Sequence, residues 1–294
     1  QIDKIASHLP LSIPQADIAI AYSGPSEMQF DFNDMWAQFI QRHRAIFRAL
    51  WPDSVAMDLV TPAMDWSNYQ LVYLPNFALL DDQAITCLRG LLEQPNGPKL
   101  VADGYFGTFA GKGHWSYKPP EGLDDLIDCR IADFDVINEF DVRQGRNTVK
   151  LPCGDFEVPA STTYSILEPH GNMEPIATIN GDVVGVQSAD GKFTWFGFTL
   201  SATDATHVTG QPASPAPVAL VHDTVAQSLL RHAGVESWFD IHGDRVVAFR
   251  RGSKQGGSLV FLLNVENKTA QAKVKPRWGV TTAEDLLEEK SLPL

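Results

Sequence analysis

Cysteine and histidine are the residue types best suited to nucleophilic or metal chemistry, but their spacing in this sequence favours neither. Cys87, Cys129 and Cys153 form no C-x-x-C pair and no even-numbered disulfide framework. None of them, and no serine, lies in the G-x-C-x-G or G-x-S-x-G pattern of a strand-to-helix turn. The eight histidines form no H-x-x-x-H or H-E-x-x-H pair. The sequence therefore predicts no metal site and no catalytic residue.

A glycine-rich and aromatic stretch at residues 103–120 is the feature most suggestive of binding. Its glycines match neither G-x-G-x-x-G nor the G-x-x-x-x-G-K-[ST] phosphate loop, so no cofactor is expected. Aromatic side chains stack on sugar rings and anchor protein interfaces, although they can also simply cover the open end of a sheet. The candidates for interface or sugar contacts, in this stretch and in one helix before it, are Trp36, Tyr105, Phe106, His114, Trp115 and Tyr117.

Strands and helices alternate in the first hundred residues, and they would position this stretch. Continuous apolar runs predict strands at residues 18–22, 55–60, 71–74 and 99–102. Apolar residues at three- and four-residue spacing predict helices over 36–51 and from 81 to about 92, with a loop at 24–34. His43 lies on the apolar side of the first helix and is expected to be packed in the core. This order predicts an open α/β sheet with crossover helices.

The second half of the chain reads mostly as short strands. Strands are predicted at 176–179, 183–187 and 193–198, with looser alternation over 131–167. A Pro-containing loop at 201–217 and a helix at 218–232 follow. Strands at 246–250 and 259–264, joined by glycines, and a third near 270–275 predict a small all-β domain from residue 236.

Composition limits the classes of partner. The chain has 294 residues, of which 44% are hydrophobic and 20% are charged, as in an ordinary globular protein. The net charge of −13 disfavours nucleic acid and anionic membrane surfaces. No apolar run approaches the roughly 20 residues of a membrane span, and residues 1–14 show no secretory signal. With sparse, unpaired cysteines, a cytoplasmic location is expected.

Several segments together resemble the non-catalytic part of family-42 glycoside hydrolases, the β-galactosidases in which a TIM barrel precedes a trimerisation domain. They are A-D-I-A-I-A-Y at 16–22, the helix from Trp36 to Leu50, V-A-M-D-L-V at 55–60, Y-Q-L-V-Y-L-P at 69–75 and K-L-V-A at 99–102. The chain departs from the family pattern at 96–98, where N-G-P replaces a Gly-Gly pair, and at 103–107, where D-G-Y-F-G replaces R-T-G. The resemblance covers about residues 16–235.

The resemblance implies a fold like that of class I glutamine amidotransferases: a flavodoxin-like open sheet that lacks the nucleophilic thiol. It also implies a linker from a preceding domain at 1–15, a trimerisation domain at 16–235 and a small β-sandwich-like domain at 236–294. The chain would then be the oligomerisation region of a β-galactosidase that forms a homotrimer. Its galactoside substrate would be bound and cleaved by carboxylates of a barrel that this chain does not contain.

Two other functions stay open on the sequence. The chain could be a complete sugar-binding or protein-interaction module, with the aromatic stretch as its binding surface. It could also be an amidotransferase-like enzyme whose nucleophile lies outside the usual motifs.

Overall fold

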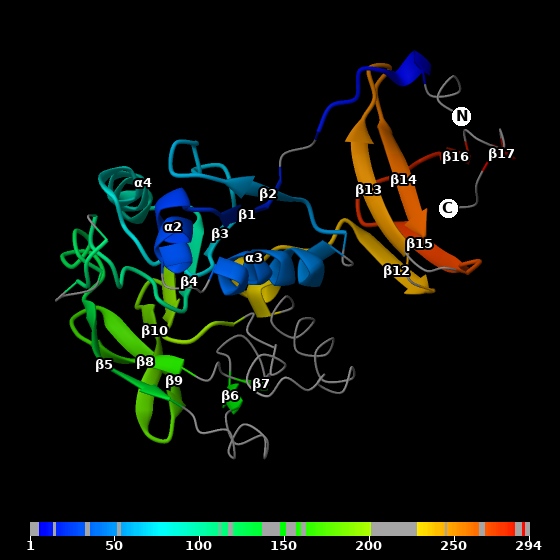
Figure 1. The fold of residues 1–294 in the computed structure, drawn as a ribbon. Coiled ribbons are helices and arrows are strands. Elements are labelled where there is room, and N and C mark those ends of the chain that lie inside the picture. Colours follow the sequence, from blue (N-terminus) through cyan, green and yellow to red (C-terminus); the bar gives the residue numbers. More distant parts are fainter. Residues whose placement is uncertain are drawn as a thin grey trace. The chain divides into compact units, whose positions relative to one another are not determined.

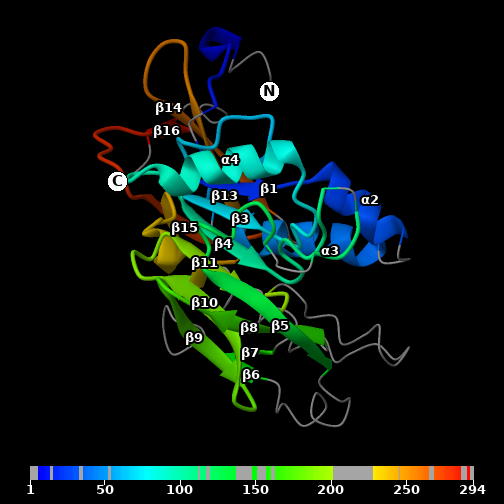
Figure 2. The ribbon, with the colours of Figure 1, turned by 90° about the vertical axis from the view of Figure 1, so that its left-hand side faces the viewer.

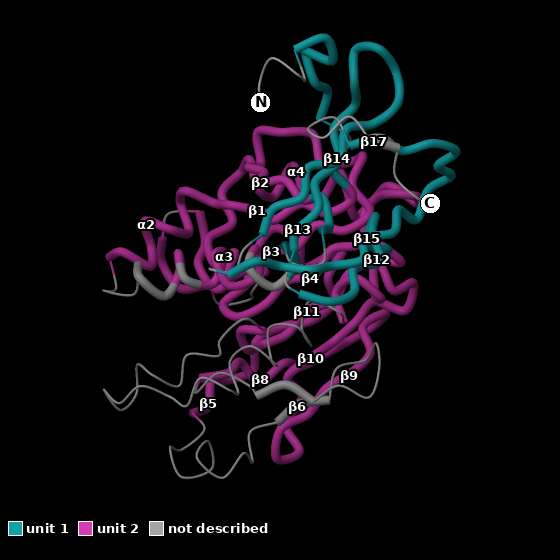
Figure 3. The backbone as a smooth tube through the Cα atoms, turned by 90° about the vertical axis from the view of Figure 1, so that its right-hand side faces the viewer, with its two compact units in different colours: residues 1–16, 50–56, 236–294 teal, residues 17–49, 57–235 magenta. Residues whose placement is uncertain are grey.

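A computed structural model describes residues 6–13, 16–32, 36–51, 54–111, 113–116, 120–136, 148–150, 157–159, 163–200, 228–244, 246–264, 268–285 and 290–291. The chain forms two compact units, shown in different colours in Figure 3. Unit 1 contains residues 1–16, 50–56 and 236–294, and unit 2 contains residues 17–49 and 57–235.

Unit 2 is built on a seven-stranded sheet in the order β2-β1-β3-β4-β11-β10-β9. Its strands are β1 (Ile18–Ala21), β2 (Met57–Val60), β3 (Leu71–Leu74), β4 (Lys99–Asp103), β9 (Met173–Ile179), β10 (Asp182–Ser188) and β11 (Phe193–Phe196). The first five strands in that order are parallel, and β10 and β9 continue the sheet antiparallel. Every residue of β1 and β3 is buried, which is why both read as unbroken apolar runs. The predicted α/β class with a mainly parallel sheet is confirmed.

Two predicted helices cover the two faces of this sheet. Figures 1 and 2 show α4 (Asp82–Glu93) on one face and α3 (Trp36–Leu50) on the other. The Asp81 carboxylate begins α4 by accepting a hydrogen bond from the N–H of Ala84 at 2.8 Å. At the other end of α4, the buried ammonium of Lys192 donates to the carbonyl of Leu92 at 3.0 Å and to that of Gln94. Asp81 thus caps the start of α4, and Lys192, just before β11, ties the end of α4 to the sheet.

One helix of unit 2 contradicts the sequence-based prediction of a loop at 24–34. The structure has α2 over Gly24–Phe32. Ser23 accepts a hydrogen bond from the N–H of Ser26 at 3.1 Å, Pro25 lies in the first turn, and Glu27 follows it. A capping serine, an early proline and an acidic first turn are the ordinary signals of a helix start, and the turn-forming residues of 24–34 concealed them.

Unit 2 also has two smaller, two-stranded sheets among its described residues. β5 (Cys129–Val136) pairs antiparallel with β8 (Thr163–Pro169), and β6 (Thr148–Lys150) pairs with β7 (Glu157–Pro159). The N–H of Ser165 in β8 donates to the carbonyl of Gly197 at 2.7 Å. A side chain at Gly197 would collide with the Ser165 backbone, so the close approach of the two segments requires glycine there.

Unit 1 consists of short antiparallel pairs. β12 (Phe239–Gly243) pairs with β15 (Ala272–Pro276), β13 (Val246–Gly252) with β14 (Ser258–Asn264), and β16 (Glu284–Asp285) with β17 (Lys290–Ser291). The 3-10 turn η1 (Ala6–His8) precedes Ser12, which exchanges two backbone hydrogen bonds with Gly252 at 3.0 Å. The predicted strands near 246–250, 259–264 and 270–275 are confirmed, while β12 was not predicted.

Part of the predicted helix at 218–232 is confirmed, since residues 228–233 are helical. Residues 218–227 and the predicted loop at 201–217 lie outside the described residues. Within the described ranges, none of the helices combines the length and the apolar character that a membrane crossing requires.

Candidate interaction surface

The carboxyl end of β4 carries a buried acid, Asp103, that holds neighbouring loops together. Tyr73 in β3 donates its hydroxyl hydrogen to the Asp103 carboxylate. The backbone N–H groups of Asn76, just after β3, and Leu200, just after β11, also donate to it, each at 2.9 Å. Burial raises the pKa of Asp103 above its ordinary value, and these donated hydrogen bonds oppose the shift. Asp103 therefore joins the ends of three adjacent parallel strands and is not exposed to solvent or substrate.

The turn after Asp103 offers no nucleophilic side chain, and in the described residues no helix begins directly after it. Gly104 has a φ of +61°, in the left-handed region, and any side chain there would collide with the amide oxygen of Asn76. A sharp turn after a buried strand is where α/β hydrolases expose a nucleophile. Glycine at this position has no side chain to do so.

The described cysteines are poor nucleophiles as well. Cys87 in α4 and Cys129 at the start of β5 are free thiols. Burial raises the pKa of Cys87 to about 11 and that of Cys129 to about 12, so both are protonated at neutral pH. Cys153 lies outside the described residues. In the described part of the chain, the amidotransferase alternative therefore gains no support.

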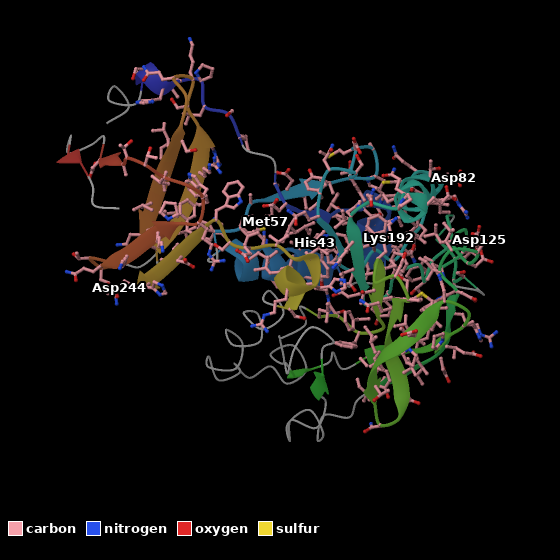
Figure 4. All side chains as sticks on the ribbon, turned by 180° about the vertical axis from the view of Figure 1, so that it is seen from behind. His43, Met57, Asp82, Asp125, Lys192 and Asp244 are labelled. Atoms are coloured by element: carbon pink, nitrogen blue, oxygen red, sulfur yellow. The ribbon has the colours of Figure 1, made fainter. Side chains whose placement is uncertain are left out.

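Metal binding also lacks a site among the described residues, where no group of three or more His, Cys, Asp or Glu side chains could hold an ion. His43, labelled in Figure 4, is packed as predicted: its Nδ1 lies 3.0 Å from the carbonyl oxygen of Phe39 and its Nε2 lies 3.2 Å from that of Ala21. Burial lowers the pKa of His43, although the two carbonyls favour its protonated form. This histidine links α3 to β1.

The described part of the glycine-rich and aromatic stretch at 103–120, here called the aromatic loop, folds back on itself. Backbone hydrogen bonds join Ala110 to His114 and Ser116 to Thr108, each at 2.9 Å. The Trp115 ring lies against Phe109 within the loop, with ring centroids 4.9 Å apart. The loop is thus a short, internally bonded structure that holds Trp115 in one place.

A chain of ring contacts connects this loop to its neighbours. Tyr105 packs edge-on against Phe30 of α2, with centroids 5.9 Å apart, and its ring is tilted by 30° against that of Phe134 in β5, with centroids 6.4 Å apart. Trp115 meets Phe134 edge-on at 5.5 Å. The loop, α2 and β5 therefore share one aromatic layer.

The six candidate contact residues differ in how far their side chains are exposed. Trp115 is 56% exposed and His114 is also exposed, whereas Tyr105 is half-buried. Phe106 is fully buried against Phe193 and Trp195, with centroids 5.6 Å from each. The backbone of Trp36 begins α3, but its side chain and all of Tyr117 lie outside the described residues.

Sequence reasoning missed three exposed apolar side chains on α2 and β5, the elements that the aromatic layer joins to the loop. Met28 and Phe32 on α2 are 73% and 93% exposed, and Val136 at the end of β5 is 64% exposed. The i, i+4 spacing of Met28 and Phe32 was the available signal, and it was hidden because this segment was predicted to be a loop. Like Trp115, all three are large apolar side chains that remain exposed on elements of unit 2.

Comparisons with known proteins agree with one another. The family model described as "Beta-galactosidase trimerisation domain" matches residues 16–219. The structure is similar to a catalytic mutant of Gan42B, a GH42 β-galactosidase from G. stearothermophilus, with a TM-score of 0.73 at 15% identity over 95% of this chain and 38% of that one. It is also similar to the β-galactosidase from Bacillus circulans sp. alkalophilus, with a TM-score of 0.70 at 14% identity over 94% of this chain and 39% of that one.

A third similar structure is the polyextremophilic β-galactosidase from the Antarctic haloarchaeon Halorubrum lacusprofundi, with a TM-score of 0.59 at 19% identity over 84% of this chain and 36% of that one. At these identities the structural likeness shows the fold alone. The chain spans less than two fifths of the length of each of these enzymes. The family model, by contrast, covers well over half of the chain. The chain therefore belongs to the trimerisation domain family of GH42 β-galactosidases, a non-catalytic region of those enzymes.

Proposed function

We propose that this chain assembles three copies of a β-galactosidase into a homotrimer, while the groups that cleave the substrate lie outside its 294 residues. The observation that carries the proposal is the match of the trimerisation domain to residues 16–219. The site chemistry is consistent with it: the described part of the chain has a glycine in the turn after β4 and protonated thiols, and it exposes several large apolar side chains. The parent enzyme would hydrolyse terminal β-galactosides.

We also propose that unit 2 is a flavodoxin-like relative of class I glutamine amidotransferases. The parallel order β2-β1-β3-β4-β11 supports this, because it is the 2-1-3-4-5 order of doubly wound flavodoxin-like sheets. The free thiols of Cys87 and Cys129 support a reducing compartment such as the cytoplasm as the site of action.

Sedimentation equilibrium and light scattering test the assembly. One copy has a mass of 32.4 kDa, and we expect a species of three times that mass at micromolar concentration. A chain that stays monomeric at the highest concentration it tolerates would exclude the proposal. Hydrolysis of nitrophenyl β-galactoside by the purified chain would contradict its second half, because the catalytic groups would then lie within these residues.

A sugar-binding role is the second candidate, favoured by the exposure of the Trp115 ring. Titration calorimetry with galactose and lactose separates it from assembly. Saturable heat that disappears in Trp115→Ala, in a protein that remains trimeric, would favour sugar binding at this loop. If no heat of binding is measured for either sugar, the sugar-binding role is excluded and contact with protein remains as the role of the exposed Trp115 ring.

A further inference from the structure

The surface that joins the copies must overcome the charge of this chain. Unit 1 contains as many basic as acidic side chains, so the whole net charge of −13 belongs to unit 2. The residues matched by the trimerisation domain lie almost entirely in unit 2 as well. Identical acidic bodies repel one another, which favours a contact whose centre is an apolar patch with few charges.

The first half of such a patch is the outer side of α2. Ser26 and Phe30 point inward, where Ser26 Oγ accepts from the N–H of Leu79 at 3.0 Å and Phe30 packs on Phe39. Successive helix residues are rotated by 100°, which places Met28 and Phe32 together, one turn apart, on the side away from this core. Their exposed fractions of 73% and 93% agree with that placement.

The second half is the outer surface of the aromatic loop and β5. Phe134 and Val136 lie two residues apart on β5 and so share one face of the strand, whereas Asp133 and Asp135 occupy the opposite face. Trp115 packs edge-on against Phe134, with the rings 74° apart, so Trp115 and Val136 present neighbouring apolar surface. Tyr164 Oη donates to Asp135 at 3.0 Å, on the face of β5 away from Val136.

The two halves adjoin. Gln29 follows Met28 on α2, and its amide oxygen lies close to Gly113 of the loop. A Cβ atom added to Gly113 would be only 2.9 Å from that oxygen. The loop therefore lies against the side of α2 that carries Gln29. Around the helix axis, Phe32 is rotated by 60° from Gln29, toward the side away from the core. The ring of Tyr105 also connects α2 and β5, because it contacts both Phe30 on α2 and Phe134 on β5.

We propose that Met28, Phe32, Trp115 and Val136, here called the α2–β5 patch, form a contact surface between copies in the trimer. The inference deepens the proposed function and rests on it. A ring of three copies uses heterologous contacts, in which this patch meets a different surface of the next copy. The Trp115 ring, held in place by Phe109 and Phe134, loses little side-chain entropy on binding, which suits it as an anchor of this contact.

Other exposed apolar side chains meet fewer of these conditions. Leu59 in β2 and Met64 just after it are exposed on unit 2, but β2 contributes no residue to the described ring contacts of the aromatic layer, whereas α2 and β5 contribute Phe30 and Phe134. Val260, Phe261, Leu262 and Leu263 of β14 are exposed on unit 1, outside the matched residues 16–219. Leu59 and Leu262 therefore serve as matched controls.

Charge insertion into the patch tests the proposal in the full chain. We expect Phe32→Asp and Val136→Asp each to raise the trimer dissociation constant by at least about tenfold, measured by sedimentation equilibrium. Leu59→Asp and Leu262→Asp, which place the same charge at similarly exposed leucines, should leave the constant unchanged. Circular dichroism and thermal melting show that each variant is folded, and Phe32→Ser gives a milder change if Phe32→Asp is not.

The outcomes separate this inference from the proposed function. If the unmodified chain is monomeric, both fail. If it is trimeric and folded Phe32→Asp and Val136→Asp variants remain trimeric with an unchanged constant, trimerisation stands and the α2–β5 patch is excluded. Dissociation caused by Leu59→Asp or Leu262→Asp instead would move the contact to β2 or to unit 1 and would equally overturn the inference.

Discussion

Ser54 and Ala248, 194 positions apart in the sequence, are joined by a hydrogen bond of 3.0 Å from the buried N–H of Ala248 to the Ser54 hydroxyl oxygen. Next to them, the rings of Trp51 and Phe249 lie 6.0 Å apart. Residues 50–56 are thereby part of unit 1, although α3 before them and β2 after them belong to unit 2. The small unit is thus assembled from three separated stretches of chain. The boundaries predicted from the sequence, after residues 15 and 235, stay predictions about which pieces fold independently.

Removal of the Ser54 hydroxyl should destabilise unit 1. In Ser54→Ala the Ala248 N–H stays buried without its acceptor, and we expect a loss of about 1–3 kcal/mol in the free energy of unfolding. Chemical denaturation followed by tryptophan fluorescence measures the loss. Ser7→Ala, at an exposed position of the same unit, should change the free energy by less than about 0.5 kcal/mol. Equal losses of unfolding free energy in Ser54→Ala and Ser7→Ala would show that the hydrogen bond does not stabilise unit 1.

The buried Asp103 predicts a pH dependence with a definite sign. Its folded-state pKa is raised above the ordinary 3.8, so the folded state binds a proton at a higher pH than the unfolded state does. The contribution of Asp103 to stability is therefore greatest when the pH is below its ordinary pKa. That contribution falls as the pH rises through the raised pKa of the folded state. Asp103→Asn removes this titration and keeps the shape of the side chain.

We accordingly expect the unfolding free energy of the unmodified protein, minus that of Asp103→Asn, to grow as the pH is lowered from 7 toward 4. Urea denaturation at a series of pH values gives both free energies, and all other titrating groups cancel in the difference. Asp124→Asn, at an exposed position, is the control and should give a flat difference. A difference that shrinks on acidification would mean that the hydrogen bonds from Tyr73, Asn76 and Leu200 outweigh burial.

Much of the central sheet could be predicted from local sequence because each buried strand is apolar on both faces. β3 was predicted at its observed bounds, and β4 was predicted one residue short, at Asp103. Asp103 was read as the start of the loop because it is charged. Its burial depends on donors from two other strand ends, which no local pattern contains.

The interaction surface was predicted less well, for a similar reason. Aromatic content identified Trp115 and His114, but it could not separate them from Phe106, which the contacts with Phe193 and Trp195 enclose in the core. Met28 and Phe32 were missed because Gly24, Pro25 and nearby acidic residues indicated a loop where Ser23 in fact caps a helix. Which apolar residues remain exposed is decided by tertiary packing, and a single sequence does not report it.

The raised thiol pKa values predict slow cysteine labelling. In a Cys153→Ser background, which leaves Cys87 and Cys129, reaction with a disulfide reagent should be slow at pH 7 and accelerate as the pH approaches about 11, the pKa of Cys87. Unfolding in urea should bring both thiols to the rate of free cysteine and so provides the internal control. Fast labelling of the folded protein near pH 6 would reveal an activated thiolate and would revive the amidotransferase alternative.

Assembly should strengthen with salt, because each copy carries its net charge of −13 on unit 2. At low ionic strength like charges repel over about 10 Å or more, and added salt screens them. Sedimentation velocity should therefore show the trimer dissociation constant falling as the sodium chloride concentration is raised.

Asp31, exposed on α2 beside Phe32, adds to this repulsion, so Asp31→Asn should lower the trimer dissociation constant at low salt and reduce its dependence on salt. Glu174→Gln on β9 removes one charge far along the sheet order and should do less. Dissociation promoted by salt would instead indicate that attractive ion pairs hold the copies together.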